Sequence, residues 1–357
     1  MKKIKICLLA TALLIFFQVS SFSQLNKIGT MMASGPEDAG KLIGGYMSPY
    51  LNALGASMSG GWYNTAKPHK LGGFDLTFTI NTSIIQESFR TFDVAELGMQ
   101  SLVLADANDN ISQTIAGKKE LGPMLNYNAG SYSQPAFELP RGTNNPVILS
   151  PMIQLGLGLV KGTEIMGRYV PEMRVGPAKV GMWGIGLKHS LLQHLPLAEK
   201  LPVLNVSLMG GYTKLTSSLG FMVTPDDIGL GILPVSGYTG AWDNQELAFN
   251  IKSFTMNLLV SADLPVVTFY GGAGFVNTKA DLQLNGDYPV LDASSGTPQV
   301  VAATDPVDMA IKNKDGGISK PRLNVGMRFK MAVITIHFDY TRANYNVVTG
   351  GLGISFR

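Results

Sequence analysis

The sequence predicts an all-β protein, a transmembrane antiparallel β-barrel of about 12 strands, in a range of about 10 to 14, behind a short N-terminal helical plug segment. Two observations predict it: apolar and polar residues alternate in many short segments, and an export signal precedes them. Alternation with a period of two places each set of residues on its own face of a sheet. It is clearest near the C-terminus, where Ile334, Ile336, Phe338 and Tyr340 alternate with Thr335, His337, Asp339 and Thr341.

The first 23 residues have the pattern of a secretory signal peptide. Three of the first five residues are lysine, an apolar run covers residues 6–19, and Ser21 and Ser23 follow it. The run is shorter than the about 20 residues of a spanning helix, so we expect cleavage of residues 1–23 and export to the outer membrane. Cys7, the only cysteine, lies inside this signal. The mature chain is therefore expected to carry no thiol, disulfide or lipid anchor.

The composition argues against several other classes of protein. The 357 residues include 41 glycines and 15% charged residues, and the formal charge is +3. Removal of the three signal lysines brings this charge to zero (3 − 3 = 0), so we expect no nucleic-acid partner. Helical periodicity is scarce, whereas alternating segments of about ten residues between turns are typical of a membrane barrel.

Residues 24–70 are predicted to form the plug segment, ahead of a barrel at residues 71–357. A helix start at Gly35 and Pro36, with two acidic residues after it, leads into apolar residues at helical spacing and a predicted end near Pro49. This helix could simply cap the sheet. It could also fold into the barrel mouth or lumen, which a barrel of this size leaves unfilled. The plug candidates are Leu42, Ile43, Tyr46, Met47, Tyr50 and Trp62.

The strands are expected in order along the rest of the chain. The first covers residues 74–81, and a hairpin turning at Lys161 and Gly162 joins two more. Residues 84–145 give a weak signal, residues 189–202 form an insertion, and residues 217–244 and 281–320 are expected to be long loops on the extracellular side. The strand ranges after the first are 153–159, 163–169, 180–188, 204–212, 249–262, 266–278, 322–330, 334–341 and 348–356.

Charged residues on the barrel strands are expected to face the lumen. A charge facing lipid costs up to about 2–4 kcal/mol near the membrane midplane, so the apolar set of each strand should face outer-membrane lipid instead. These inward charges could pair with one another and hold the barrel's shape, or they could line a polar path. The lumen-lining candidates are Glu164, Arg168, Arg322, Arg328, Lys330, His337 and Asp339.

The motifs of catalysis and cofactor binding are incomplete in this sequence. His189 and Ser190 are neighbours, so on a strand their side chains would point to opposite faces, and the flanking acid of a catalytic triad is missing. The histidines are scattered rather than spaced for a metal. Residues 106–117 begin like a calcium loop but lack its glycine and its bidentate glutamate. We therefore expect neither an enzyme nor a bound metal or cofactor.

Two motifs resemble an uncharacterised group of Gram-negative outer-membrane proteins of unknown function. The first is the stretch from Tyr46 to Lys67, which contains the run from Gly60 to Lys67. The second runs from Trp183 to Ser190, with Pro196 after it. The resemblance covers most of the mature chain and implies a barrel. More distantly, a short helical hatch ahead of a barrel resembles the long-chain fatty acid transporter family, although this chain is shorter and lacks that family's Asn-Pro-Ala hatch motif.

These observations predict a passive outer-membrane channel for a small hydrophobic or amphipathic molecule, gated by the plug segment. A structural or adhesive barrel that acts through its extracellular loops is the alternative. Either protein would be inserted by the barrel-assembly machinery. The sequence specifies neither the solute, nor the direction of transport, nor the oligomeric state.

Overall fold

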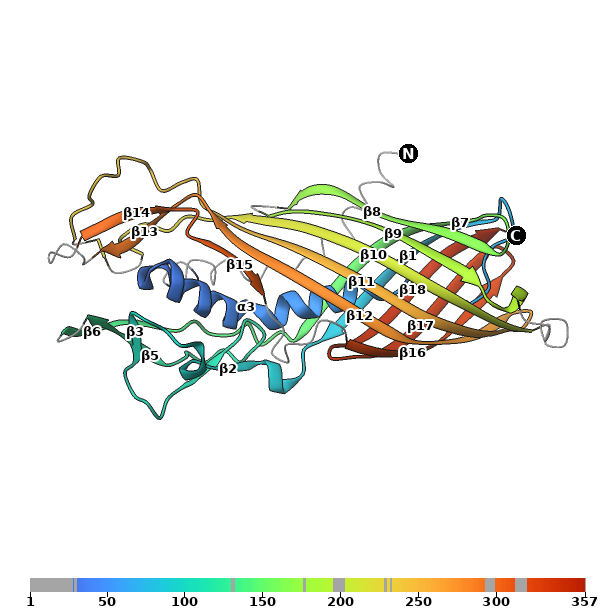
Figure 1. Ribbon diagram of the computed structural model, residues 1–357, viewed down its shortest axis with the longest axis horizontal. Helices are drawn as coiled ribbons and strands as arrows, with labels where there is room; N and C mark the ends of the chain where they lie inside the picture. The colour runs from blue at the N-terminus through green and yellow to red at the C-terminus, as the bar shows by residue number, and fades with distance from the viewer. Residues whose placement is uncertain are drawn as a thin grey trace.

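The protein is a closed antiparallel barrel of ten strands with a long extension at one end (Figure 1). The computed structural model describes residues 28, 31–129, 132–175, 178–194, 203–227, 230–231, 233–292, 299–311 and 320–356, and the predicted signal peptide lies outside them. Pairing of the first barrel strand with the last closes the barrel. The barrel strands are β1 (Phe74–Ile84), β7 (Val147–Gly158), β8 (Thr163–Val175), β9 (Ala178–Ser190), β10 (Leu204–Gly220), β11 (Glu246–Asp263), β12 (Val267–Asn285), β16 (Lys320–Met331), β17 (Ile334–Arg342) and β18 (Asn346–Phe356).

The predicted membrane-type barrel is confirmed, and its strand number lies at the lower end of the predicted range, below the 12 strands that we expected. Three of the ten strands are long, since β10, β11 and β12 contain 17, 18 and 19 residues. A barrel strand crosses a membrane with about 9–11 residues. The outer parts of these three strands therefore continue beyond the barrel.

The two ends of the barrel differ in their connections. The end that carries the C-terminus has the short turns at residues 159–162, 264–266 and 332–333. The opposite end carries the long connections at residues 85–146, 221–245 and 286–319. Outer-membrane barrels have short periplasmic turns and long extracellular loops, so this difference between the two ends is typical of them. We use the name distal extension for the described residues of the long connections together with the outer parts of β10 to β12.

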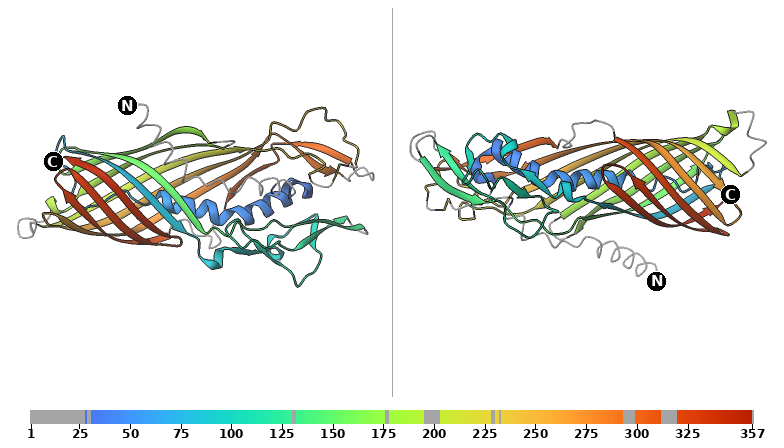
Figure 2. Two further views of the ribbon diagram at one scale, coloured as in Figure 1. Left: turned by 180° about the vertical axis from the view of Figure 1, so that it is seen from behind. Right: turned by 90° about the horizontal axis from the view of Figure 1, so that it is seen from below.

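The distal extension is folded around the N-terminal helix (Figure 2). Its apolar core contains Leu125, Leu247 and Tyr288 together with residues of that helix. We expected loops over much of this region, but it contains short strands, and side chains from two of them, Phe92 and Met309, lie against glycines of the helix. The short strands are β2 (Thr91–Asp93), β3 (Leu102–Leu104), β4 (Ile111–Gln113), β5 (Met124–Ala129), β6 (Tyr132–Glu138), β13 (Asp287–Asp292), β14 (Gln299–Thr304) and β15 (Val307–Ile311).

The helix α3 (Pro36–Met58) begins in the distal extension and ends inside the barrel. Its predicted end near Pro49 is wrong, since the helix continues through this proline to Met58. A proline inside a helix costs about 3 kcal/mol, and burial of most residues in the turns on both sides offsets this cost. The turns of α3 after Pro49 are rich in small residues because the surrounding barrel strands leave little room for side chains. At Gly55, for example, a Cβ atom would lie 2.1 Å from the Thr278 side chain.

The barrel wall has an apolar outer face and a polar inner face. Phe338 and Leu352 on the outer face are 55% and 56% exposed, whereas Thr335, His337 and Thr341 on the inner face are buried. On the closing strands the residues predicted to face lipid are thus exposed, and those predicted to face the lumen are buried. None of the helices in the described ranges has the length and apolar character needed to cross a membrane.

Candidate functional site

The barrel lumen is occupied by an extended stretch of the chain, residues 59–70, which we call the lumen segment. It leaves the C-terminal end of α3 and runs to a turn at Gly72 and Gly73, where backbone hydrogen bonds link both glycines to Gly158 and the Gly73 N–H to the Lys70 carbonyl. Gly61, near its start, has a φ of +65°, which residues other than glycine rarely adopt. Ten strands enclose a wider interior than the eight that side chains alone can fill. The lumen segment occupies this additional space.

The wall holds the lumen segment mainly by its backbone. Five of its carbonyl oxygens accept hydrogen bonds from polar side chains of five different strands, β7, β8, β9, β10 and β16. The pairs are Arg322 to Ser59, Arg168 to Gly60, Gln154 to Trp62, Lys188 to Thr65 and Ser207 to Ala66. Each of these bonds can be exchanged for a bond to water, so its net contribution is only about 0.5–1.5 kcal/mol for neutral groups and about 1.5–3 kcal/mol for charged ones.

Two arginines bind the end of α3 where it enters the barrel. Arg168 donates from Nη1 to the Met58 carbonyl at 2.9 Å and from Nη2 to the Gly60 carbonyl at 2.7 Å. Arg322 donates from Nη1 to the Ser59 carbonyl at 2.8 Å. The Met58 carbonyl is the last of the helix and the other two follow it directly, so both arginines lie at the negative end of the helix dipole. The two cations therefore fix the helix end electrostatically.

An apolar patch lies beside Arg168 in the lumen. Trp62 is 1% exposed, and the Arg168 guanidinium carbon lies 3.6 Å from the centre of its ring. The wall leaves room for this ring by using glycine. A Cβ atom would lie 2.7 Å from the ring at Gly186 and 2.6 Å from it at Gly211. The other members of the patch are Tyr63, Ala66, Met166, Met209, Leu259 and Tyr270.

A charged cluster closes the lumen at the end that carries the C-terminus. Glu164 pairs with Lys188 at 3.1 Å and accepts a hydrogen bond from the backbone N–H of His69 at 2.8 Å. The His69 Nε2 atom lies 3.0 Å from a carboxylate oxygen of Asp75. His69, Asp75 and Glu164 present ligand atoms within 4.8 Å of one another. They could hold a metal ion only if Lys188 moved, because its ammonium group already occupies the cation position beside Glu164.

The remaining lumen candidates lie on β16 and β17. Arg328 donates to the Asn64 side chain at 3.1 Å and lies 3.9 Å from the Asp263 carboxylate. Asp339 accepts from the Tyr270 hydroxyl at 3.1 Å and from Asn324 at 2.7 Å. His337 is buried, and its ring nitrogens have no hydrogen-bond partner among the described residues. Lys330 is half-buried near the turn at residues 332–333.

The plug candidates divide into two groups in the structure. Leu42, Ile43, Tyr46 and Met47 are buried in the core of the distal extension, with Tyr50 packed against it. Trp62 alone lies in the lumen. The helix therefore fills the mouth and the distal extension, and the residues after it fill the membrane-level interior.

Sequence reasoning missed several wall residues that hold the lumen segment, namely Gln154, Lys188 and Ser207. Gln154 and Ser207 lie between apolar neighbours on the other face, and Lys188 follows the exposed Leu187, so the alternation alone could have identified them. The glycines opposite Trp62 gave no comparable signal. Their role depends on a contact between distant parts of the chain.

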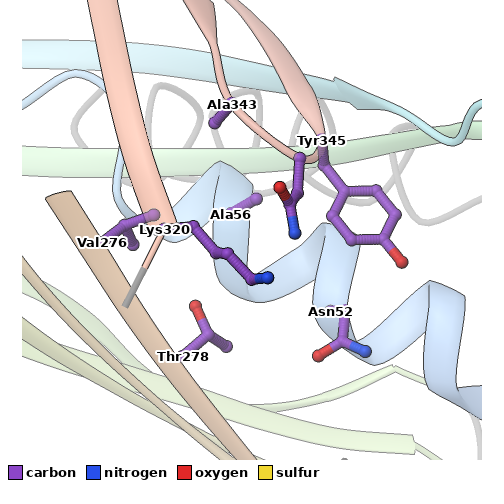
Figure 3. A pocket seen from close by; sticks show the side chains of 8 residues that line it. Asn52, Ala56, Val276, Thr278, Lys320, Ala343 and Tyr345 are labelled. Carbon is purple, nitrogen blue, oxygen red and sulfur yellow. The ribbon is translucent and has the colours of Figure 1, made fainter. Parts of the chain in front are cut away.

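A small pocket lies where β12 passes from pairing with β16 to pairing with β15 (Figure 3). Its volume is about 30 Å³, which is room for about one water molecule. Asn52 and Ala56 of α3 form its inner side. The remaining lining residues are Val276, Thr278, Lys320, Ala343, Asn344 and Tyr345.

A family model described as a family of unknown function, DUF6588, matches residues 1–356. The chain belongs to this family. The resemblance to an uncharacterised family of outer-membrane proteins is thereby confirmed. No curated protein matches the chain in sequence.

Solved structures similar to this DUF6588 protein are outer-membrane barrels. The outer membrane protease OmpT from Escherichia coli is 9% identical with a TM-score of 0.32, over 80% of this chain and 97% of that chain. The transport unit of the autotransporter AIDA-I from Escherichia coli is 10% identical with a TM-score of 0.33, over 88% and 98%. The toluene transporter TodX of P. putida is 8% identical with a TM-score of 0.25, over 80% and 90%. These likenesses concern the fold alone.

Proposed function

We propose that this DUF6588 protein is a passive outer-membrane channel that is closed by the lumen segment and opens when this segment moves. One observation carries the proposal: a separate stretch of chain fills a lumen whose own wall is polar, and exchangeable hydrogen bonds hold it there. In this proposal the signal peptide is cleaved, the barrel-assembly machinery inserts the chain, and the protein catalyses no reaction.

The lumen favours an amphipathic solute over a purely hydrophobic one. If Trp62, Tyr63 and Ala66 left, the apolar side chains of Met166, Met209 and Leu259 would remain. These side chains would form an apolar binding surface beside the guanidinium group of Arg168. The rest of the inner face is polar, as the buried hydroxyls of its threonines and serines illustrate, so it offers no continuous apolar path.

Substitution of Gly211 tests whether the lumen segment is the barrier. Gly211→Val places a side chain in the space of the Trp62 ring, since a Cβ atom there already lies 2.6 Å from it. A steric cost of about 1–3 kcal/mol should raise the open population by roughly 5- to 150-fold. We expect planar-bilayer recordings to show frequent openings in this variant and rare openings in the wild-type protein.

The matched control is Gly210→Val, one residue earlier on the same strand. A Cβ atom at Gly210 meets nothing within 4 Å, so this variant should conduct like the wild-type protein. Equal conductance of the two variants, with both folded, would contradict the proposal.

A second candidate function is supported by the distal extension. Its packed core around α3 forms a stable surface beyond the barrel, as a structural or adhesive barrel requires. A Gly211→Val protein that folds but never conducts would favour this function.

A further inference from the structure

We infer that Arg168 and Arg322 form an anion-binding site in the lumen. In the closed state the carbonyls of Met58, Ser59 and Gly60 occupy this site. The inference deepens the proposed function, on which it rests, by assigning the solute an oxyanion group such as a carboxylate, sulfate or phosphate.

Within the described part of the chain, Arg168 and Arg322 lack the carboxylate partner that two other cations of the lumen have. Among the described residues, neither guanidinium lies within ion-pair distance of a carboxylate, whereas Lys188 has Glu164 at 3.1 Å and Arg328 has Asp263 at 3.9 Å. Both arginines are only 2% exposed. A buried cation without a partner is costly, and the carbonyls of Met58, Ser59 and Gly60 supply partial negative charge in place of an anion.

The hydrogen bonds of Arg168 have the geometry with which arginine recognises an oxyanion. The two terminal nitrogens of Arg168 each bind a different oxygen, at 2.9 and 2.7 Å. Arginine uses the same two nitrogens for bidentate binding of two oxygens of one oxyanion. Arg322 completes the site with Thr255 and Thr341, whose hydroxyls lie 3.0 and 3.3 Å from its guanidinium nitrogens. Once the lumen segment moves away, Arg168 loses the Gly60 carbonyl and Arg322 loses the Ser59 carbonyl, so their guanidinium nitrogens can bind the oxygens of an oxyanion instead.

A tryptophan on the barrel wall provides a probe that stays at the site when the lumen segment leaves, because Met166 lies two residues before Arg168 on β8 and belongs to the patch around Trp62. The experiment uses the full chain with Trp62→Ala to release the lumen segment, with Trp183→Phe and Trp242→Phe, and with Met166→Trp as the only tryptophan. Quenching of its fluorescence is compared between iodide, an anion, and caesium, a cation, at equal low ionic strength. Two uncompensated cations should raise the local anion concentration on the order of tenfold, so iodide should quench far more strongly than caesium.

Removal of the charges should abolish this preference. The double variant Arg168→Gln and Arg322→Gln should be quenched about equally by the two ions. The control Arg174→Gln removes a charge from the exposed part of the same strand, β8, and should keep the iodide preference. Equal quenching by the two ions with both arginines present, or no quenching by either ion, would overturn the inference.

These outcomes are separate from those of the conductance test. Conduction by the Gly211→Val pore, together with equal quenching of the wall tryptophan by the two ions, retains the proposed function and refutes the anion site. An iodide preference without any conductance refutes the channel and retains the site.

Discussion

Phe338→Arg is expected to prevent assembly of the barrel, whereas His337→Ala should leave the folding yield close to that of the wild-type protein. Phe338 lies at the middle of β17 and is 55% exposed on the outer face. An arginine facing lipid near the midplane costs about 2–4 kcal/mol. His337 faces the lumen, where its ring makes no hydrogen bond with a described residue, so its removal costs little in polar interactions.

Folding yield in lipid vesicles, read from heat-modifiable migration on gels, measures this difference. The two positions are neighbours on one strand, and a shift of register by one residue would exchange their faces. Equal tolerance of the two substitutions would contradict the assignment of lipid and lumen faces on β17, and with it the inward placement of Asp339.

The second large effect is expected from Trp62→Ala. Replacement of a buried tryptophan by alanine costs about 3–5 kcal/mol, and here the loss falls on the lumen segment, because Trp62 holds it against Arg168 and the patch around Met209. We expect the segment to leave its place far more often. A cysteine introduced as Ala66→Cys should then react with a maleimide reagent more than about 100-fold faster than in the chain that keeps Trp62.

Trp183→Ala is the matched control for this experiment. Trp183 lies on the outer face and is 48% exposed, so its loss should leave the labelling rate of the cysteine unchanged. The single native cysteine falls in the predicted signal peptide, so the introduced thiol is expected to be unique. Slow labelling in the Trp62→Ala chain would show that the ring does not fasten the lumen segment.

The parts of the fold that follow from local patterning could be predicted from the sequence. On β17 every polar residue predicted to face the lumen does so, because the apolar residues between them have no favourable place except the lipid face. The helix start at Pro36 could also be predicted, because its signals lie within a few residues. The same reasoning correctly predicted a lumen that side chains leave unfilled.

The parts that depend on contacts between distant residues could not be predicted. The helix passes Pro49 because β12 and neighbouring elements enclose its later turns, and no local signal reports that enclosure. Strands β13 to β15 lie in a segment rich in turn residues, and they form because β13 pairs with β14 and β15 adds to β12. Gly186 and Gly211 are glycine because Trp62 lies against them from another part of the chain.

The current through a barrel whose lumen segment can be locked tests most directly whether this segment closes the channel. The Thr65 and Ser261 hydroxyl oxygens lie 3.2 Å apart, so Thr65→Cys and Ser261→Cys should form a disulfide that ties the lumen segment to β11. In a Trp62→Ala chain carrying this pair, we expect no conductance under oxidising conditions and frequent openings after reduction. The same current before and after reduction, with the disulfide verified by mass spectrometry, would contradict the claim that the lumen segment closes the channel.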